Sequence, residues 1–417
     1  MNISKTALSK LLVLLLLLVI GWNYWLPAAN DYFNHVSPAN ENRPADLKNI
    51  DFHAYYDAGM RFNGGRDPYV YGNDPQGIPV LTDYIYPPTF LPFFSLLARL
   101  PYEVARVAWL GLYALSYLGV LAWLFFSFRH TGRMTFLALA LILTLASFPL
   151  LDHILTGQAD ILVICLILGS YLAYASGRRL LSAVLLAAAT LLKVSPVFLL
   201  FYYLIFQRDG RFLVFYLCTC LVLAGLSLLF VPFGLYPEYV LHILPGVSAG
   251  TSNYLNQSLL RYLSFSPWIA RLVSFGGLAL LAVLIWLVSR RYTPAERLPA
   301  LPLGENHFTA ETAFLLNLTA ILIFVGKAWP ATYVWLILPA AWLMAGLIDR
   351  PTRLGAWGAI VLAGFLVLAK NYGYPVLESL NLWGNLLLST WLSLGLLKPG
   401  SLFSARVQSD PGAPRTP

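Results

Sequence analysis

The stretch from Asp51 to Pro88 reads DFHAYYDAGMRFNGGRDPYVYGNDPQGIPVLTDYIYPP and is the longest polar segment of an otherwise apolar chain. It follows the first apolar run and sets five aspartates among tyrosines, glycines and prolines. Glycine, proline and aspartate favour turns, so the stretch predicts a large loop between membrane-embedded segments.

Composition decides the class of the remaining chain. Of 417 residues, 59% are hydrophobic and 11% are charged, whereas about a quarter of a soluble domain is charged. Apolar runs of about 20 residues recur, which predicts helices and not a barrel. The fold class is therefore an all-α polytopic membrane protein. The net charge of +8 comes from short Lys and Arg clusters between the runs, so we expect no nucleic-acid partner.

The first apolar run, Ala7–Trp25, has two lysines at its N-terminal end, Lys5 and Lys10, and predicts an uncleaved span with a cytoplasmic N-terminus. Outer loops are then expected at 28–100 and 233–268, with Tyr86–Leu100 as an interfacial helix because it is too short to cross. About ten crossings result, with both termini cytoplasmic. The other nine are Val104–Phe128, Met134–Leu151, Ile161–Tyr174, Phe212–Val231, Ile269–Ser289, Ala310–Val325, Tyr333–Ile348, Gly355–Ala369 and Trp383–Leu397. A short outer loop, DHILTGQAD (Asp152–Asp160), is expected between the second and third of these.

A re-entrant hairpin is expected between two arginine clusters, Arg178–Arg179 and Arg208–Arg211. About 28 residues separate them, fewer than the roughly 40 that two crossings need. Its arms are Leu180–Leu192 and Val197–Phe206, with Lys193 at the tip. Residues 1–398 are expected to form a single transmembrane domain, and 399–417 a disordered cytoplasmic tail.

Two charged residues are the main candidates for chemistry. Asp51, if partly desolvated among aromatic side chains, would have a raised pKa and could act as a general base. The alternative is a solvated aspartate or the cap of an amphipathic helix. Lys193 lies in an apolar hairpin and needs a cavity or an anion. A lipid phosphate is one candidate partner, and the alternative is snorkelling or pairing with an acid such as Asp160.

Other polar residues are weaker candidates. Arg261 and Lys327 are outer-face cations that could hold a phosphate. His53 and His153 lie on separate segments without metal-ligand spacing, so solvated or core histidines are expected and no metal site is predicted. The cysteines lie inside apolar runs and indicate neither a disulfide nor a metal site.

Four pieces in order carry a family resemblance: DFHAYYDAG with GGRDPY, then YPPTFLPFFSLL, then TGQAD with LLKVSP, then SNYLNQSLLRYL. Over about Leu11 to Pro339 the chain resembles glycosyltransferase family 87, the polyprenyl-phosphate-mannose-dependent mannosyltransferases of the GT-C membrane fold.

The resemblance implies transfer of a sugar, mannose by family default, from a polyprenyl-phosphate donor to a lipid-linked or glycan acceptor, with inversion. Asp51 matches the acidic residue that deprotonates the acceptor, and Lys193 would lie near the donor phosphate. No cofactor or metal is implied, since fixed cations can stabilise the leaving phosphate. The remaining substrate-binding candidates are His53, Tyr55, Tyr56, Tyr86, Gln158, Asp160, Asn256, Gln257, Arg261 and Lys327.

One departure concerns the late outer loop, GKAWPATYVWLILP, where the family usually carries a pair of histidines after a tryptophan. Trp329 is present, but Ala331 and Thr332 stand in place of the histidines, and Lys327 is the candidate substitute. The resemblance places the protein in the plasma (inner) membrane with its active site on the outer side. A transporter or flippase of lipid-linked sugars is the alternative class, and it would predict repeats that the sequence lacks.

Overall fold

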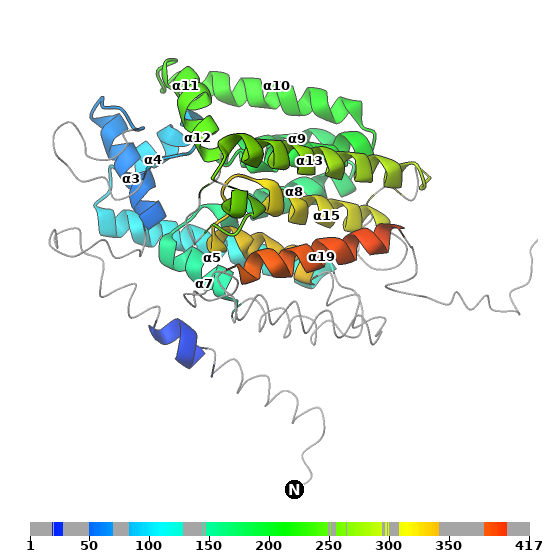
Figure 1. The fold of residues 1–417 in the computed structure, drawn as a ribbon. Coiled ribbons are helices and arrows are strands. Elements are labelled where there is room, and N and C mark those ends of the chain that lie inside the picture. Colours follow the sequence, from blue (N-terminus) through cyan, green and yellow to red (C-terminus); the bar gives the residue numbers. More distant parts are fainter. Residues whose placement is uncertain are drawn as a thin grey trace, which may run out of the picture.

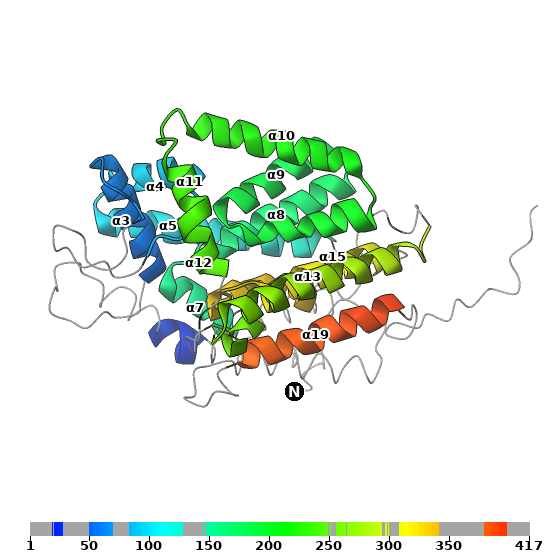
Figure 2. The same cartoon turned by 45° about the horizontal axis from the view of Figure 1, so that its top comes forward.

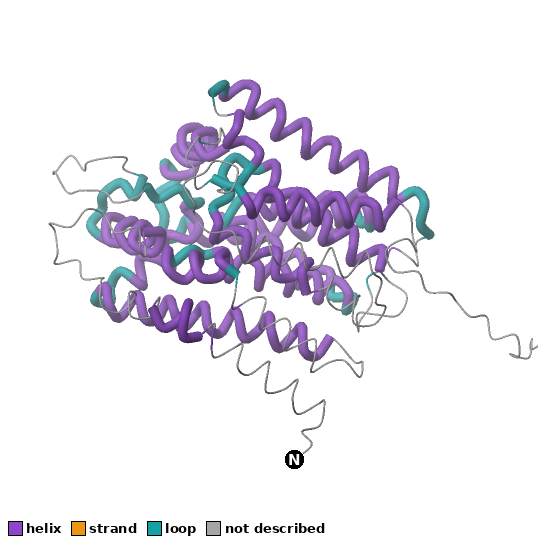
Figure 3. The backbone as a smooth tube through the Cα atoms, turned by 60° about the horizontal axis from the view of Figure 1, so that its bottom comes forward, coloured by secondary structure: helices purple, strands orange, loops and turns teal. Residues whose placement is uncertain are grey.

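The computed structural model describes residues 19, 21–27, 50–69, 83–127, 145, 147–248, 251, 256–263, 265–293, 297, 299, 308–341 and 379–397. Within these ranges every regular element is a helix (Figure 3). The prediction of an all-α protein is confirmed for this part of the chain.

Six helices lie alongside one another as a bundle (Figure 1). α8, α9 and α10 pack in sequence order, and α15 packs between α13 and α19 (Figure 2). The outward face of α10 is apolar, with Leu217 50% and Leu221 73% exposed, as expected of a helix that faces lipid. The six are α8 (Asp160–Ala175), α9 (Arg179–Leu192), α10 (Gly210–Ser227), α13 (Pro267–Ser289), α15 (Phe308–Phe324) and α19 (Leu380–Leu397).

Shorter elements gather at one end of this bundle, and one long helix, α5, runs beside α8. α3 packs against α4, where Gly59 approaches the backbone of Phe94 so closely that any side chain would collide. The remaining elements are η1 (Gly21–Trp25), α3 (Ile50–Asn63), η2 (Pro88–Phe90), α4 (Leu91–Leu97), α5 (Tyr102–Ser127), α7 (Phe148–Thr156), η3 (Ser195–Leu199), η4 (Phe201–Phe206), α11 (Leu235–Glu238), η5 (Tyr239–Ile243), α12 (Leu244–Ser248), η6 (Leu259–Leu263) and η7 (Pro330–Leu336).

Four of the described helices are long and apolar enough to cross a membrane, or five if α7 and α8 count as one bent span. Predicted runs and observed helices agree within a few residues for α5, α8, α10, α13, α15 and α19. The predicted span at 355–369, most of those at 7–25 and 134–151, and the tail at 399–417 lie outside the described residues. The count of ten crossings therefore stays a prediction.

The hairpin after Arg178 has the expected two short arms. α9 forms the first arm, and the 3-10 helix η3 and the π-helix η4 form the second. Its base is closed by an ion pair between Arg179 Nε and Asp209 Oδ2 at 2.9 Å, and Asp209 also caps α10 by accepting from Phe212 N. The tip is Lys193, which follows the end of α9 in an extended conformation, and η3 starts two residues later at Ser195. Re-entry of this hairpin into a membrane stays a prediction.

The arginine clusters lie at one end of the bundle. Arg179 starts α9, Arg211 is the second residue of α10, and Arg290 follows α13. Arg208 Nη2 reaches Ser289 Oγ at 3.5 Å, which joins these ends. We call this the arginine end. α8 ends and α9 begins at the arginine end. Asp160 at the start of α8 and Lys193 after the end of α9 therefore lie at the opposite end of the bundle, which we call the site end.

The segment Asp152–Asp160 was predicted as a loop, and that prediction is wrong for its first half. α7 continues to Thr156 and ends at Gly157, whose φ of 76° is the left-handed conformation that glycine tolerates. Apolar residues at helical spacing carry the helix past Leu151, and only Gly157–Ala159 remain as a turn. α7 and α8 are bent by 117° at this turn.

Candidate active site

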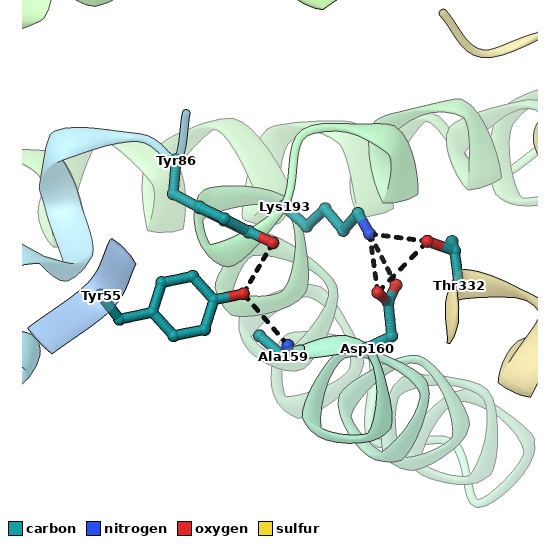
Figure 4. A network of polar contacts seen from close by, with 6 residues as sticks. All are labelled: Tyr55, Tyr86, Ala159, Asp160, Lys193 and Thr332. Carbon is teal, nitrogen blue, oxygen red and sulfur yellow. Dashed lines mark hydrogen bonds and ion pairs between the residues drawn. The ribbon is translucent and has the colours of Figure 1, made fainter. Parts of the chain in front are cut away.

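α3 supplies the first side chains of the site. Asp51 and Tyr55 lie four residues apart and so share one face of this helix. The hydroxyl of Tyr55 donates to Tyr86 Oη at 2.7 Å and accepts from Ala159 N at 3.3 Å (Figure 4). The ring of Tyr55 stacks on Phe94. Tyr55 thereby fixes α3 against the turn that begins α8.

The turn at Gly157 is held from two sides. Trp109 Nε1 of α5 donates to Gly157 O at 2.9 Å. A Cβ at position 157 would lie 2.7 Å from Phe52 Cβ, so α3 packs directly on the glycine. This close packing places Gln158 and Asp160 opposite Asp51.

Lys193, Asp160 and Thr332 form a ring of charge-assisted hydrogen bonds (Figure 4). Lys193 Nζ donates to both carboxylate oxygens of Asp160, at 2.7 and 2.8 Å, and to Thr332 Oγ1 at 3.2 Å. Asp160 is fully buried, whereas the Lys193 side chain is 18% exposed. The lysine compensates a buried carboxylate, which is one of the roles that the sequence left open for it.

Asp51 is partly buried and lies next to this ring. Burial raises its pKa from 3.8 to about 7, against hydrogen bonds from Gln158 and Thr156 and the charge of Lys193, which lower it. The charge of Asp160 adds to the increase. A carboxylate that titrates near neutral pH can take up a proton from an alcohol and hold it.

Gln158 contributes a second polar atom to this region. Its side chain is buried and hydrogen-bonds Asp51, and its Oε1 has no hydrogen-bond partner among the residues that the structure describes. A buried amide oxygen without a partner is uncommon and is suited to accept from a hydroxyl of a bound molecule.

His53, Tyr56 and Tyr102 form an aromatic group on α3 and the start of α5, and Phe52 packs against two of its rings. The rings of His53 and Tyr56 lie 5.8 and 5.1 Å from that of Tyr102, and Tyr56 Oη donates to Leu100 O. Burial lowers the pKa of His53, and the nearby Asp57 opposes this. The structure therefore places these two predicted substrate contacts apart from Asp51 and Lys193.

Asn256 joins two loops at the site end. Its Nδ2 donates to Gly326 O at 3.1 Å and its Oδ1 accepts from Ala328 N at 3.0 Å. Gln257 adds a backbone bond to Ala328 O at 2.7 Å and accepts from Tyr333 Oη. We call these contacts the Asn256 clasp. Both polar atoms of the Asn256 side chain are engaged with backbone, and a role in binding substrate stays a prediction.

Two predicted phosphate ligands lie on the same loops. Arg261 Nη1 donates to Ser379 Oγ at 3.1 Å, at the start of α19. Burial lowers the pKa of Lys327, and the charge of Asp83 opposes this, so Lys327 lies beside the loop that precedes Tyr86.

Three residues of the site were missed in the sequence. Thr332 stands at a position already noted for departing from the family pattern, which was the available signal. Asp152 on α7 interacts electrostatically with Asp51 and accepts a hydrogen bond from the backbone of Ala331. Thr156 hydrogen-bonds Asp51. These last two were assigned to a loop, and their helical positions follow only from the end of α7 at Gly157.

No group of three His, Cys, Asp or Glu side chains in the described ranges is arranged to hold a metal ion.

No curated protein and no solved structure matches the chain. The model of glycosyltransferase family 87 matches residues 84–304, more than half of the chain, and this region contains Gln158, Asp160, Lys193 and Asn256. The chain belongs to glycosyltransferase family 87 and is a membrane glycosyltransferase.

Proposed function

We propose that the protein transfers a hexose, mannose by family default, from a polyprenyl-phosphate donor to a hydroxyl of a lipid-linked or glycan acceptor, with inversion. Asp51 is the general base in this proposal. The observation that carries it is a partly buried carboxylate with a pKa near 7 beside a lysine at the site end. Such a carboxylate is matched to proton transfer at neutral pH.

The proposed reaction is a single displacement. The acceptor oxygen attacks the anomeric carbon from the face opposite the phosphate, and its proton passes to Asp51. The bond between the anomeric carbon and the phosphate oxygen breaks, and polyprenyl phosphate leaves with the bonding electrons. Inversion follows because the new bond forms on the face opposite the old one.

Lys193 stabilises the charge that develops on the leaving phosphate. A fixed cation in a partly buried site needs little reorganisation during the reaction, so its stabilising effect is larger than in water. Arg261 and Lys327 are further proposed phosphate contacts, and Gln158 and Asn256 are proposed to line the site. Tyr86, 7% exposed, and the buried Tyr55 are proposed to shape the wall, since the face of Tyr55 is already stacked on Phe94.

The proposed location is the plasma membrane, with the site on the outer side. Cytoplasmic loops are enriched in Lys and Arg, which favours the arginine end inside and the site end outside. Exposed aromatic residues near the site end, Phe230 and Trp268, agree with a position at the membrane interface. Both termini are then cytoplasmic, and residues 1–398 form one domain.

The test is transfer by purified protein in nanodiscs from a panel of polyprenyl-phosphate sugars to lipid-extract acceptors, with EDTA present. Wild type should transfer sugar, and Asp51→Asn should lose transfer by a hundredfold or more, the low end of a typical general-base effect. Asp57→Asn, on the same helix but paired with Arg61, is the matched control and should retain activity.

Wild-type-like transfer by Asp51→Asn would exclude Asp51 as the base. Absence of transfer from every donor by well-folded protein would contradict the enzyme proposal. The alternative class, a flippase of lipid-linked sugars, would then be tested by movement of the same donors across liposome bilayers.

A further inference from the structure

The ammonium group of Lys193 has no N–H to spare. It carries three N–H donors, and three acceptors surround it: both carboxylate oxygens of Asp160 and the hydroxyl of Thr332. The hydroxyl also reaches Asp160 Oδ2 at 3.3 Å. A hydroxyl donates one hydrogen bond and accepts others, so Thr332 can donate to the carboxylate while it accepts from the ammonium.

The hydroxyl of Thr332 is itself held in place. Thr332 is 2% exposed, and its backbone N donates to Trp329 O at 2.9 Å within the first turn of η7. The next residue back, Ala331, donates its backbone N–H to Asp152 of α7. η7 is thus anchored to α7, and the hydroxyl is presented to Lys193 by a segment 139 residues away in the chain.

The geometry points to Thr332 as a positioning residue for Lys193. Its hydroxyl fixes the direction of the ammonium group on Asp160. It accepts the hydrogen bond from the N–H that donates to a phosphate oxygen once the donor has bound. This rests on the proposed function, since the anion for which Lys193 is held is the donor phosphate. The neutral hydroxyl at 3.2 Å is the contact that exchanges, because the two carboxylate contacts are shorter and charge-assisted.

The test is the reactivity of the Lys193 amine, measured without any ligand. Reductive methylation modifies the neutral amine, and peptide mass spectrometry follows its rate at this one lysine. The variants are Thr332→Val, which keeps the shape and removes the hydroxyl, and Thr332→Ser, which keeps the hydroxyl. Asp160→Asn marks the rate of an unpaired lysine. Thr190→Val is the matched control, since Thr190 lies in the same hairpin and donates to Leu186 O of its own helix.

Lys193 should be methylated about three to ten times faster in Thr332→Val than in wild type, the change expected for loss of a hydrogen bond of ordinary net strength. Thr332→Ser and Thr190→Val should remain near the wild-type rate, and Asp160→Asn should be fastest. Equal rates in Thr332→Val and wild type would overturn the proposal. So would a rise in Thr332→Ser as large as that in Thr332→Val, which would indicate a packing effect.

A second arm separates this inference from the proposed function. A C55 polyprenyl phosphate in detergent micelles should protect Lys193 of wild type against methylation if the donor phosphate binds there. If the lipid does not protect Lys193 of wild type, the proposed donor site is contradicted. If the methylation rates of wild type and Thr332→Val still differ without the lipid, the positioning by Thr332 remains established. Protection of equal strength in Thr332→Val and wild type would overturn the exchange of the hydroxyl for a phosphate oxygen.

Discussion

Lys193 and Asp160 form a 2.7 Å ion pair between the tip of the hairpin and the first residue of α8. A fully buried carboxylate requires such a partner, because an unpaired charge in the protein interior is strongly destabilising. The pair joins the hairpin to α8. It also keeps the Lys193 ammonium group at the site end when no anionic ligand is bound.

The pH dependence of transfer follows from Asp51. A general base works in its ionised form, and the pKa of this carboxyl is raised to about 7. We expect kcat/KM to increase with pH below about 7, approximately tenfold per pH unit, and to level off above it. The measurement is initial rate at low donor concentration from pH 5 to pH 9. A profile that is flat between pH 5 and pH 7 would rule out this titration.

The ion pair predicts a double-mutant cycle. Lys193→Met leaves Asp160 buried without a partner and should destabilise the protein by about 3–5 kcal/mol. Adding Asp160→Asn removes the orphaned charge, so stability should largely recover while binding of polyprenyl phosphate stays weak. Unfolding in detergent and lipid binding measure the two effects. Equal stability of the single and double variants would show that the pair is not coupled.

Two of the left-handed glycines, Gly157 and Gly177, allow a matched comparison. Gly157→Ala and Gly177→Ala both impose a left-handed conformation on alanine, at φ of 76° and 74°, a strain of about 1–2 kcal/mol. Gly157 also faces Phe52, whereas no atom of the described part of the chain lies within 4 Å of a Cβ at Gly177. Gly157→Ala should therefore lose more stability and most of the activity, as thermal unfolding and transfer assays would measure. Equal losses would mean that α3 adapts to the added methyl group.

The orientation of the bundle can be tested at the two ends of α10. Gly210 starts α10 at the arginine end and Gly234 follows it at the site end, and a Cβ at either position meets no described residue within 4 Å. In a chain with its three cysteines replaced by alanine, a membrane-impermeant maleimide added to intact cells should label Gly234→Cys and leave Gly210→Cys unlabelled until lysis. The reverse pattern would place the site in the cytoplasm.

The bundle was predictable because each helix is specified locally. Runs such as Pro267–Ser289 are apolar over enough residues to define a helix without knowledge of its neighbours, and the arginines mark their ends. The hairpin followed from the spacing of two arginine clusters. The pairing of Lys193 with Asp160 was one of the alternatives. The sequence shows that a buried lysine needs an anionic partner, but it does not show which anion that is.

The missed features depend on contacts between distant segments. Thr332 meets Lys193 across 139 residues, and Asn256 meets Gly326 across 70. No local pattern specifies such a partner. The end of α7 was misplaced for another reason: Gly157 stops the helix by its positive φ, and the predicted loop instead began at Asp152, five residues earlier.

The Asn256 clasp makes two distant segments of the chain a single unit of local unfolding. The Asn256 side chain forms hydrogen bonds with the backbone of Gly326 and Ala328, and a backbone hydrogen bond joins Gln257 N to Ala328 O. Amide hydrogens on both segments should consequently exchange with solvent at one common rate, set by opening of the clasp. A molecule that orders the segment around Asn256 also orders the segment that leads to Thr332, so acceptor and donor binding would be thermodynamically linked through this one amide.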